Sequence, residues 1–537
     1  MSTEHDNNAV NYERLYYYPR ELILHLECRP HVKSQEVHTA IDHIIGINAV
    51  DPWNKLQWIK EFQGLDPVLY FDDLSDDDKK TFILVPLEMV DPKATQEEFG
   101  ELIKEIYKDK DLVKLSDPKE DRGKYGGKEI SNDIILKYVY PNWFMAATHH
   151  QGSGGGPGGA PCQVANPPVP MPRFSFPKVD PILFDPVNSS SDVHVAILDT
   201  APNENDFTHA RSDIVWYPEH SFKPWLDQPM DIDYAICDPL RRVCFRRLTH
   251  FSLLDQHYEM PDHGLFVSGI VHTIAKKATL HLYEVLNRFG LGTFYTVAQA
   301  LSKILERDIG RPLIISCSLV LDLPQDGKNS PDFLINIYND LIIHTTESMQ
   351  MLFTGIAKLH RVIVVAAAGN DNPVMRDRRS NQPLNTSINR PKACYPAAFA
   401  EVIGVGALQK NIPLKPHNLT SYSNFSESDY YTLGGEPGEI NGVLGVYICK
   451  FPINLSPTQT GKPAIAKSSI QYSSNNTGWA WWCGTSFAAP IISGLLAVWW
   501  GRNILKRAKD AKVFLDQNST QWSRGSNTIS EIEVTQN

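Results

Sequence analysis

The hydrophobic positions of the first 147 residues alternate between two kinds of pattern. Short apolar runs typical of strands are interleaved with segments whose apolar residues recur at helical spacing. The predicted order is strand, helix, strand, strand, helix, strand, over residues 21–27, 37–45, 67–71, 81–90, 99–106 and 134–140. This order is that of a ferredoxin-like βαββαβ domain.

Beyond this region, four apolar segments each carry a polar residue at one end. They cover residues 193–199, 262–269, 361–370 and 484–494. The first and third predict buried strands that end near Asp199 and Asn370, and the second and fourth predict helices that begin near His263 and Ser486. Because the C-terminal ends of strands in an open α/β sheet share one edge, we expect these four side chains to converge.

The segment around Ser486 allows a second interpretation. No residue from Gly478 to Gly501 is charged, and that length of uncharged chain is also compatible with a membrane span. Gly484, Pro490 and Gly494 interrupt the segment, and tryptophans flank it. These features favour a buried core helix that begins just before Ser486.

Each polar residue alone has an ordinary structural explanation. Asp199 and Asn370 are typical turn or cap residues, and His263 is one histidine among eighteen. Together they supply an acid, a base, an amide donor and a hydroxyl, which are the groups that acyl transfer requires. A helix N-terminus beside Ser486 also favours a developing alkoxide.

The segments resemble those of the subtilisin-like serine proteases, the subtilase family. VAILDT, AAAGN and GTSFAAP match the acid, oxyanion and serine segments, and HGLFVSG matches the histidine segment usually written HGTHVAG. The order Asp, His, Ser along the chain is that of subtilisin. The sequence departs from the family at Ala201, Leu265, Phe266 and Ser268, which changes the packing around the histidine and touches no triad atom.

A fifth segment, IISCSLV, resembles the family's strand whose backbone pairs with substrate. Its residues Ser318, Leu319 and Val320 are therefore candidate substrate-binding residues, with Val320 where glycine is usual. The resemblance implies a subtilisin-like, mostly parallel sheet flanked by helices. It also implies a serine endopeptidase in which Asp199 orients His263, His263 activates Ser486, and Asn370 binds the oxyanion. A catalytically silent binding domain and an esterase on the same scaffold stay open as alternatives.

The N-terminal domain takes its meaning from its position, since subtilases commonly carry a propeptide of this topology before the protease domain. Leu136–Trp143 resembles the propeptide ending of the family, with Tyr140 where glutamate is usual. This implies a tethered inhibitor, followed by a Gly/Pro-rich linker in which the chain can cut itself. A permanent adaptor with an uncut linker is the alternative. The expected divisions are 1–147 for this domain, 148–185 for the linker, 186–515 for the protease domain and 516–537 for a polar tail.

Composition and charge narrow the expected partners. With 51 basic and 62 acidic residues the net charge is −11, which argues against nucleic acid held by bulk charge. The N-terminus has no signal-peptide pattern, and eight cysteines without paired spacing indicate reduced thiols, so we expect a cytoplasmic protein without a membrane partner. The partners expected are a polypeptide substrate and the chain's own N-terminal domain. The chemistry needs no cofactor; calcium is common in the family, but no ligand set here is convincing.

Overall fold

A computed structural model gives the arrangement of the chain. It describes residues 17–28, 32–45, 52–59, 68–72, 81–108, 128–131, 133–147, 161–164, 172–180, 192–214, 231–233, 259–308, 310–321, 338–370, 390–409, 418–425, 430–436, 442–453, 471–524 and 527–536.

The N-terminal domain has the predicted ferredoxin-like topology. Its main elements are β1 (Tyr17–Cys28), α1 (Ser34–Ile45), β3 (Leu69–Asp72), β4 (Thr81–Met89), α2 (Gln96–Ile106) and β6 (Ile134–Ala147). Strand β1 pairs antiparallel with both β4 and β6, and β3 pairs with the other edge of β4, so the spatial order is β6-β1-β4-β3. Three short elements, η1 (Trp53–Lys55), β2 (Leu56–Trp58) and β5 (Lys128–Ser131), extend this frame.

Helix α2 shows how local sequence sets these bounds. Thr95 and Glu98 form a capping box at its N-terminus, in which each side chain binds the backbone N–H of the other residue. The predicted apolar face is confirmed, because Phe99, Leu102 and Ile103 are at most 1% exposed. The helix therefore begins at a polar signal and is held by one buried stripe.

The second domain is built on a nine-stranded sheet of order β10-β11-β9-β13-β15-β16-β17-β23-β22. All neighbours pair in parallel except β22 and β23. The bounds are β10 (Asp231–Asp233), β11 (Thr279–Glu284), β9 (His194–Asp199), β13 (Leu313–Cys317), β15 (Val362–Ala367), β16 (Ile403–Leu408), β17 (Tyr430–Leu433), β23 (Asn527–Glu531) and β22 (Thr520–Arg524). This is the mostly parallel sheet that the resemblance to the subtilases implies.

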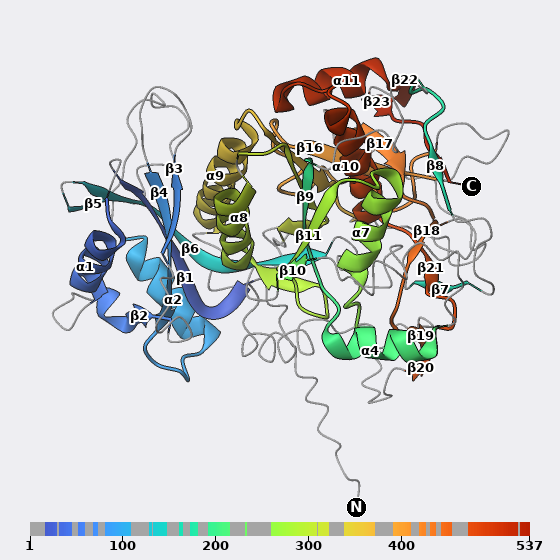
Figure 1. Ribbon diagram of the computed structural model, residues 1–537. Coiled ribbons are helices and arrows are strands. Elements are labelled where there is room, and N and C mark those ends of the chain that lie inside the picture. The colour runs from blue at the N-terminus through green and yellow to red at the C-terminus, as the bar shows by residue number, and fades with distance from the viewer. Residues whose placement is uncertain are drawn as a thin grey trace, which may run out of the picture.

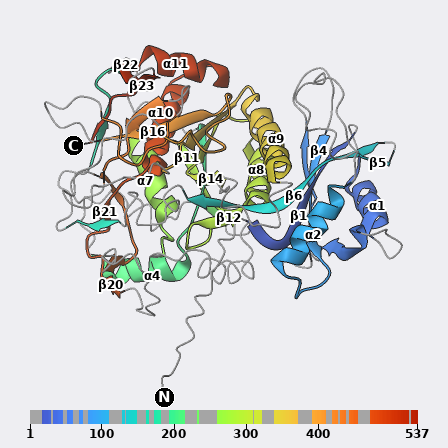
Figure 2. The same cartoon turned by 180° about the vertical axis from the view of Figure 1, so that it is seen from behind.

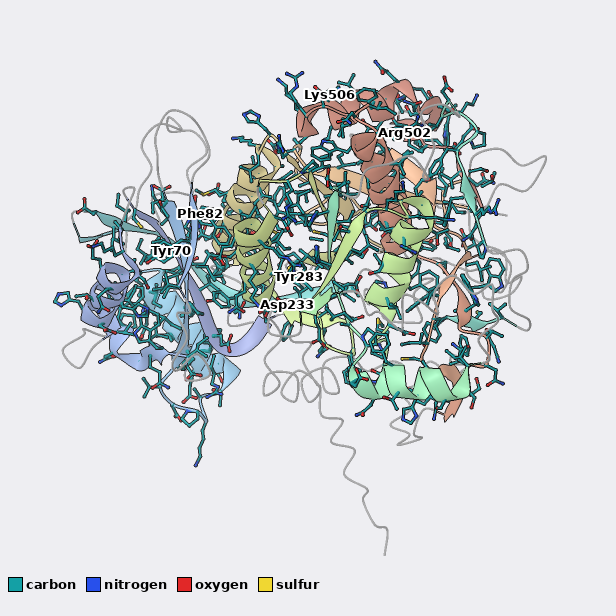
Figure 3. All side chains as sticks on the ribbon, viewed as in Figure 1. Tyr70, Phe82, Asp233, Tyr283, Arg502 and Lys506 are labelled. Atoms are coloured by element: carbon teal, nitrogen blue, oxygen red, sulfur yellow. The ribbon has the colours of Figure 1, made fainter. Side chains whose placement is uncertain are left out.

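Helices cover both faces of this sheet. Helices α7 (His263–Ile274) and α10 (Thr485–Gly501) lie on one face, and α8 (Phe294–Asp308) and α9 (Tyr338–Ala357) on the other, as Figures 1 and 2 show from opposite sides. Every residue of α10 is buried, which confirms the core helix. Within the described residues, no helix is long and apolar enough to cross a membrane. Arg502, which caps the C-terminus of α10, and Lys506 lie on the outer side of the second domain (Figure 3).

The C-terminal residues differ from the expected polar tail. After α11 (Ala511–Gln517), strands β22 and β23 close one edge of the main sheet, and Ile529 is fully buried. Thr432 donates its hydroxyl hydrogen bond to the carbonyl of Ile532 at 2.9 Å. The strand that pairs with β17, β23, was not predicted because the composition here is mostly polar and only isolated apolar residues face inward.

Parts of the expected linker also pack on the second domain. Strand β7 (Cys162–Gln163) pairs with β21 (Trp479–Trp482), which also pairs with β18 (Val443–Val446). Strand β8 (Phe174–Ser175) pairs with β24 (Thr535–Gln536). Much of the expected linker, including 148–160, lies outside the described residues, and so do Cys237 and Cys244, the only close cysteine pair in the sequence. The six cysteines that the structure describes are free thiols.

The two domains share one sheet through β6. The end of this strand lies between β12 (Leu291–Thr293) and β14 (Leu319–Leu321) of the second domain and pairs antiparallel with both. Figure 1 shows β6 running from the N-terminal domain to the edge of the second. Three further elements lie together at the lower edge of the second domain in Figure 1: α4 (Glu204–Asp213), β19 (Phe451–Ile453) and β20 (Gln471–Ser473).

Candidate active site

Asp199 and His263 form a buried pair at the C-terminal edge of the main sheet. Asp199 is the last residue of β9 and His263 the first of α7, and Asp199 Oδ1 lies 2.7 Å from His263 Nδ1. Both side chains are fully buried. The backbone N–H of Thr200 also donates to Asp199 Oδ1, at 2.7 Å. The contact of one carboxylate oxygen with one imidazole nitrogen fixes the orientation of the ring.

Gly264 makes this contact possible. A Cβ at this position would lie 2.8 Å from the Cβ of Asp199 and 2.2 Å from the carbonyl oxygen of Thr200. Thr200 in turn donates its hydroxyl to the carbonyls of Met260 and Pro261, at 3.1 and 3.0 Å. The end of β9 and the chain before His263 are therefore locked together at van der Waals distance.

Asn370 lies beside the turn that carries Ser486. Its Oδ1 accepts hydrogen bonds from the backbone N–H and the hydroxyl of Thr485, at 3.1 and 2.9 Å. A Cβ at Gly484 would lie 3.4 Å from Asn370 Nδ2, so the NH2 group faces the turn before Ser486.

His263 and the Ser486 turn are neighbours through aromatic packing. The imidazole centroid lies 5.2 Å from the Trp482 ring, edge-on, and 5.3 Å from the ring of Phe487, which follows Ser486. Phe266, one of the departures from the family sequence, packs on Phe487 with centroids 4.6 Å apart. Asp199, His263, Asn370 and Ser486 thus gather in one region, and Phe266 packs against the two aromatic residues that contact the histidine.

The predicted substrate-pairing strand is covered by the N-terminal domain. Ser318 donates its hydroxyl to the carbonyl of Ser486 at 3.0 Å, and Leu319 and Val320 begin β14. In the register of β14 with β6, Leu319 is opposite Ala147 and Val320 opposite Ala146. The last four residues of β6, from Phe144 to Ala147, are at most 1% exposed. An extended segment of the chain itself therefore fills the predicted groove.

Three features of this region were not predicted from the sequence. Strand β12 forms the second edge of the groove, with Gly292 opposite Met145, and Gly290 accepts from Ala147 N–H at 2.8 Å. Thr485 orients Asn370, as described above. Asp262 Oδ2 accepts from the backbone N–H groups of Ile448 and Cys449, at 2.8 and 3.0 Å.

Burial also shifts the pKa of Asp262. Burial raises the pKa of its carboxyl to about 6, against the opposing effect of the two backbone N–H donors. Its position directly before His263 was the available sequence signal. The signal for β12 was weaker, because three residues after a glycine turn do not distinguish a strand from a loop.

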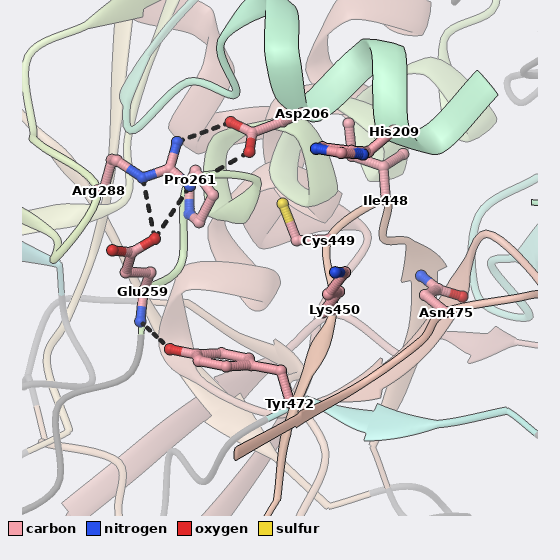
Figure 4. A pocket seen from close by; sticks show the side chains of 10 residues that line it. All are labelled: Asp206, His209, Glu259, Pro261, Arg288, Ile448, Cys449, Lys450, Tyr472 and Asn475. Atoms are coloured by element: carbon pink, nitrogen blue, oxygen red, sulfur yellow. Dashed lines mark hydrogen bonds and ion pairs between the residues drawn. The ribbon is translucent and has the colours of Figure 1, made fainter. Parts of the chain in front are cut away.

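A pocket of about 230 Å³ is lined by Glu259 and Pro261, which precede His263, and by Arg288 (Figure 4). Arg288 crosses it and binds Asp206 of α4 through two nitrogens, at 2.7 and 3.2 Å, and Glu259 at 3.0 Å. The carbonyl of Arg288 accepts from Met260 N–H at 2.7 Å. This ion network ties α4 to the segment that positions His263.

The chain was compared with known families, sequences and structures. A profile of the Subtilase family, peptidase family S8, matches residues 190–528. Among solved structures, the crystal structure of a lanthipeptide protease aligns over 64% of this chain and 86% of its own, with 20% identity and a TM-score of 0.39. No curated protein sequence matches the chain. From the family match over more than half of its length, the chain belongs to the Subtilase family.

Proposed function

We propose that the chain is a serine endopeptidase whose nucleophile is Ser486. The observation that carries this proposal is the buried 2.7 Å contact between Asp199 and His263, packed against the aromatic residues that flank Ser486. Burying a carboxylate against an imidazole costs desolvation free energy. Such a pair is therefore expected where it has a catalytic role or where it is fully hydrogen-bonded. Its place at the strand edge beside a helix N-terminus fits general-base chemistry.

In the proposed mechanism, Ser486 Oγ attacks the peptide carbonyl while His263 takes its proton. Asp199 holds the imidazole in the reactive tautomer and stabilises the imidazolium. Asn370 Nδ2 and a backbone N–H beside Ser486 donate to the tetrahedral oxyanion. His263 then protonates the leaving amine, and water hydrolyses the acyl-enzyme by the same route in reverse. None of these steps calls for a cofactor.

We further propose that the N-terminal domain is a tethered inhibitor. The pairing of Phe144–Ala147 with both β12 and β14 supports this, because a substrate would need the same backbone groups. The division of the chain into inhibitor, linker and protease, the cytoplasmic location, and the lack of nucleic-acid and membrane partners stay predictions from the sequence.

A fluorophosphonate probe tests the nucleophile. We expect it to label Ser486, weakly in the intact chain and strongly in a Met145→Asp variant whose covering strand is loosened, and never in Ser486→Ala. A folded protein that stays unlabelled in both the intact chain and Met145→Asp would support the silent binding domain instead. Comparing casein with a short acyl ester separates a peptidase from an esterase on the same scaffold.

Mass analysis of the purified protein tests self-cleavage in the 148–185 region. We expect the active chain to yield a shortened species and Ser486→Ala to stay full-length. A single full-length species in both proteins would favour a permanent adaptor.

A further inference from the structure

Three metal-ligating side chains meet at the N-terminal foot of the main sheet, away from the candidate active site. His194 begins β9, His281 is the third residue of β11, and Asp308 ends α8. In the parallel register Thr279 lies opposite His194, so His281, two residues later, faces the same side of the sheet. One ligand atom from each residue lies within 4.8 Å of the others, and all three residues are buried.

Two of the distances within this cluster are close to those between ligands of one metal ion. His194 Nδ1 lies 3.1 Å from His281 Nε2 and 3.1 Å from Asp308 Oδ1. Ligands bound tetrahedrally to one zinc ion at about 2.0–2.1 Å are about 3.3–3.4 Å apart. The two distances to His194 Nδ1 are within a few tenths of an ångström of this spacing, and His281 and Asp308 each offer a ligand atom within 4.8 Å of the other.

The Asp308 carboxylate is the feature that is hardest to explain if the three side chains form only a hydrogen-bonded cluster without metal. Asp308 is 1% exposed, and among the described residues neither of its oxygens accepts a hydrogen bond of good geometry. His194 Nδ1 faces both Asp308 Oδ1 and His281 Nε2, and its one proton cannot serve two acceptors well. A cation between the three groups would satisfy the carboxylate and both imidazole lone pairs at once.

In the absence of metal, Arg311 determines which nitrogen of His194 carries the proton. Its Nη1 donates to His194 Nε2 at 3.0 Å, which leaves the proton of a neutral His194 on Nδ1, the atom that would bind the ion. Metal binding requires this proton to leave Nδ1 and Nε2 to become a donor, so Arg311 must turn away. Arg311 is exposed at the surface.

We propose that His194, His281 and Asp308 form a site for a divalent transition metal of the zinc class, with water as a further ligand. Two imidazoles and one carboxylate are ligands that zinc accepts. The ion would fasten the end of α8 to β9 and β11. Asp199 lies five residues further along β9, roughly 17 Å away, so the site is structural and takes no part in the acyl transfer.

The test uses the full chain in the Ser486→Ala background, freed of metal by a chelator, loaded with zinc chloride alone and desalted. We expect one zinc per chain, a melting temperature several degrees above that of the zinc-free protein, and, with cobalt in place of zinc, the visible absorption of a low-symmetry site. A wild-type site that keeps no zinc and gives no such cobalt spectrum overturns the proposal, whatever the variants do.

Variants then locate the site. Asp308→Asn and His281→Gln should lose the bound zinc, while His360→Gln, an exposed histidine, should keep it. Arg311→Gln should lower the zinc dissociation constant about tenfold, because a competing cation and donor is removed. Zinc retained by Asp308→Asn at the wild-type level, or weakened by Arg311→Gln, would instead indicate a hydrogen-bond cluster and refute the site.

Discussion

Asn370 Oδ1 accepts two hydrogen bonds from Thr485, one from its backbone N–H at 3.1 Å and one from its hydroxyl at 2.9 Å. The hydroxyl of Thr485 also accepts from Gly369 N–H at 3.2 Å. The residue before the proposed nucleophile therefore holds the residue that we propose to bind the oxyanion. Because Gly369 has φ +108°, the backbone reaches this position only with glycine there.

This relationship predicts graded effects on kcat. Asn370→Ala should lower kcat about 10²–10³-fold, the usual loss for one oxyanion donor. Thr485→Val removes one of the two donors that orient the amide and should lower kcat by about tenfold or less, with little change in KM. Thr485→Ser keeps the hydroxyl and should restore kcat. Equal kcat in Thr485→Val and Thr485→Ser would show that the hydroxyl does not position Asn370.

Gly264→Ala should damage both stability and activity. The added Cβ would overlap the carbonyl of Thr200 at 2.2 Å and press on Asp199, so α7 must move away from β9. We expect a loss of about 1–3 kcal/mol in unfolding free energy and about 100-fold in kcat/KM, since His263 is displaced from its acid. Thermal unfolding and peptidase assays on the same preparation measure both effects.

Gly355→Ala is the matched control, because a Cβ there meets no atom within 4 Å in helix α9. It should leave kcat/KM unchanged and raise stability by about 0.5–1 kcal/mol. If Gly264→Ala behaved like this control, the close approach of α7 to Asp199 would not matter for function.

Met145→Asp should raise the peptidase activity of the uncut chain. Met145 is fully buried where β6 pairs with β12 and β14, and a charge there is costly to bury, so the covering strand should leave the groove more often. Ile135→Asp, on the same strand but 37% exposed, is the control. A fluorogenic peptide assay should show a faster initial rate for Met145→Asp alone; equal rates in both variants would argue against inhibition by this strand.

The end of β6 also shows where prediction from sequence stops. The apolar run predicts a strand from Ile134 to Tyr140, whereas β6 continues to Ala147. In the structure Asn142 donates to Glu21 at 2.8 Å and accepts from Tyr295 N–H at 3.3 Å, so its polar groups are satisfied inside the strand. Such partners lie far away in sequence, and no local pattern reveals them.

The candidate functional residues also fall into a group that could be predicted from the sequence and a group that could not. Asp199, His263, Asn370 and Ser486 could be predicted because each ends or begins a long apolar segment, and parallel strands bring such ends together. The cluster at the foot of the sheet could not be predicted. His281 meets His194 only through the register of two parallel strands 87 positions apart, and the hydrophobic pattern does not encode that register.

The interface between the N-terminal domain and α9 should weaken as the pH falls. His25 Nδ1 lies 2.9 Å from Ser348 Oγ, and His344 Nδ1 lies 2.6 Å from Tyr107 OH, so each histidine reaches across the interface. Burial, helped by the charge of Lys137 and by His344, lowers the pKa of His25 to about 3. Burial likewise lowers the pKa of His344 to about 4.

Both histidines are therefore neutral when docked, whereas in an open or unfolded chain they would titrate near 6.5. The stabilisation is fully present above pH 6.5 and is lost progressively as the pH falls through the docked-state pKa values of about 4 for His344 and about 3 for His25, because the open chain binds more protons. Each histidine should cost about 2 kcal/mol at pH 5. In Ser486→Ala, thermal unfolding of the N-terminal domain should become easier below pH 6.5, and proteolysis of β6 faster.

The double variant His25→Gln with His344→Gln should flatten this dependence, because glutamine does not titrate. His360→Gln, at an exposed position, should keep the wild-type slope. If the double variant loses stability between pH 7 and 5 as steeply as the wild type, other groups govern the acid response. If its slope is flatter and its activity at pH 5 rises less than that of an active wild-type chain, protonation of these two histidines drives the release of the covering strand.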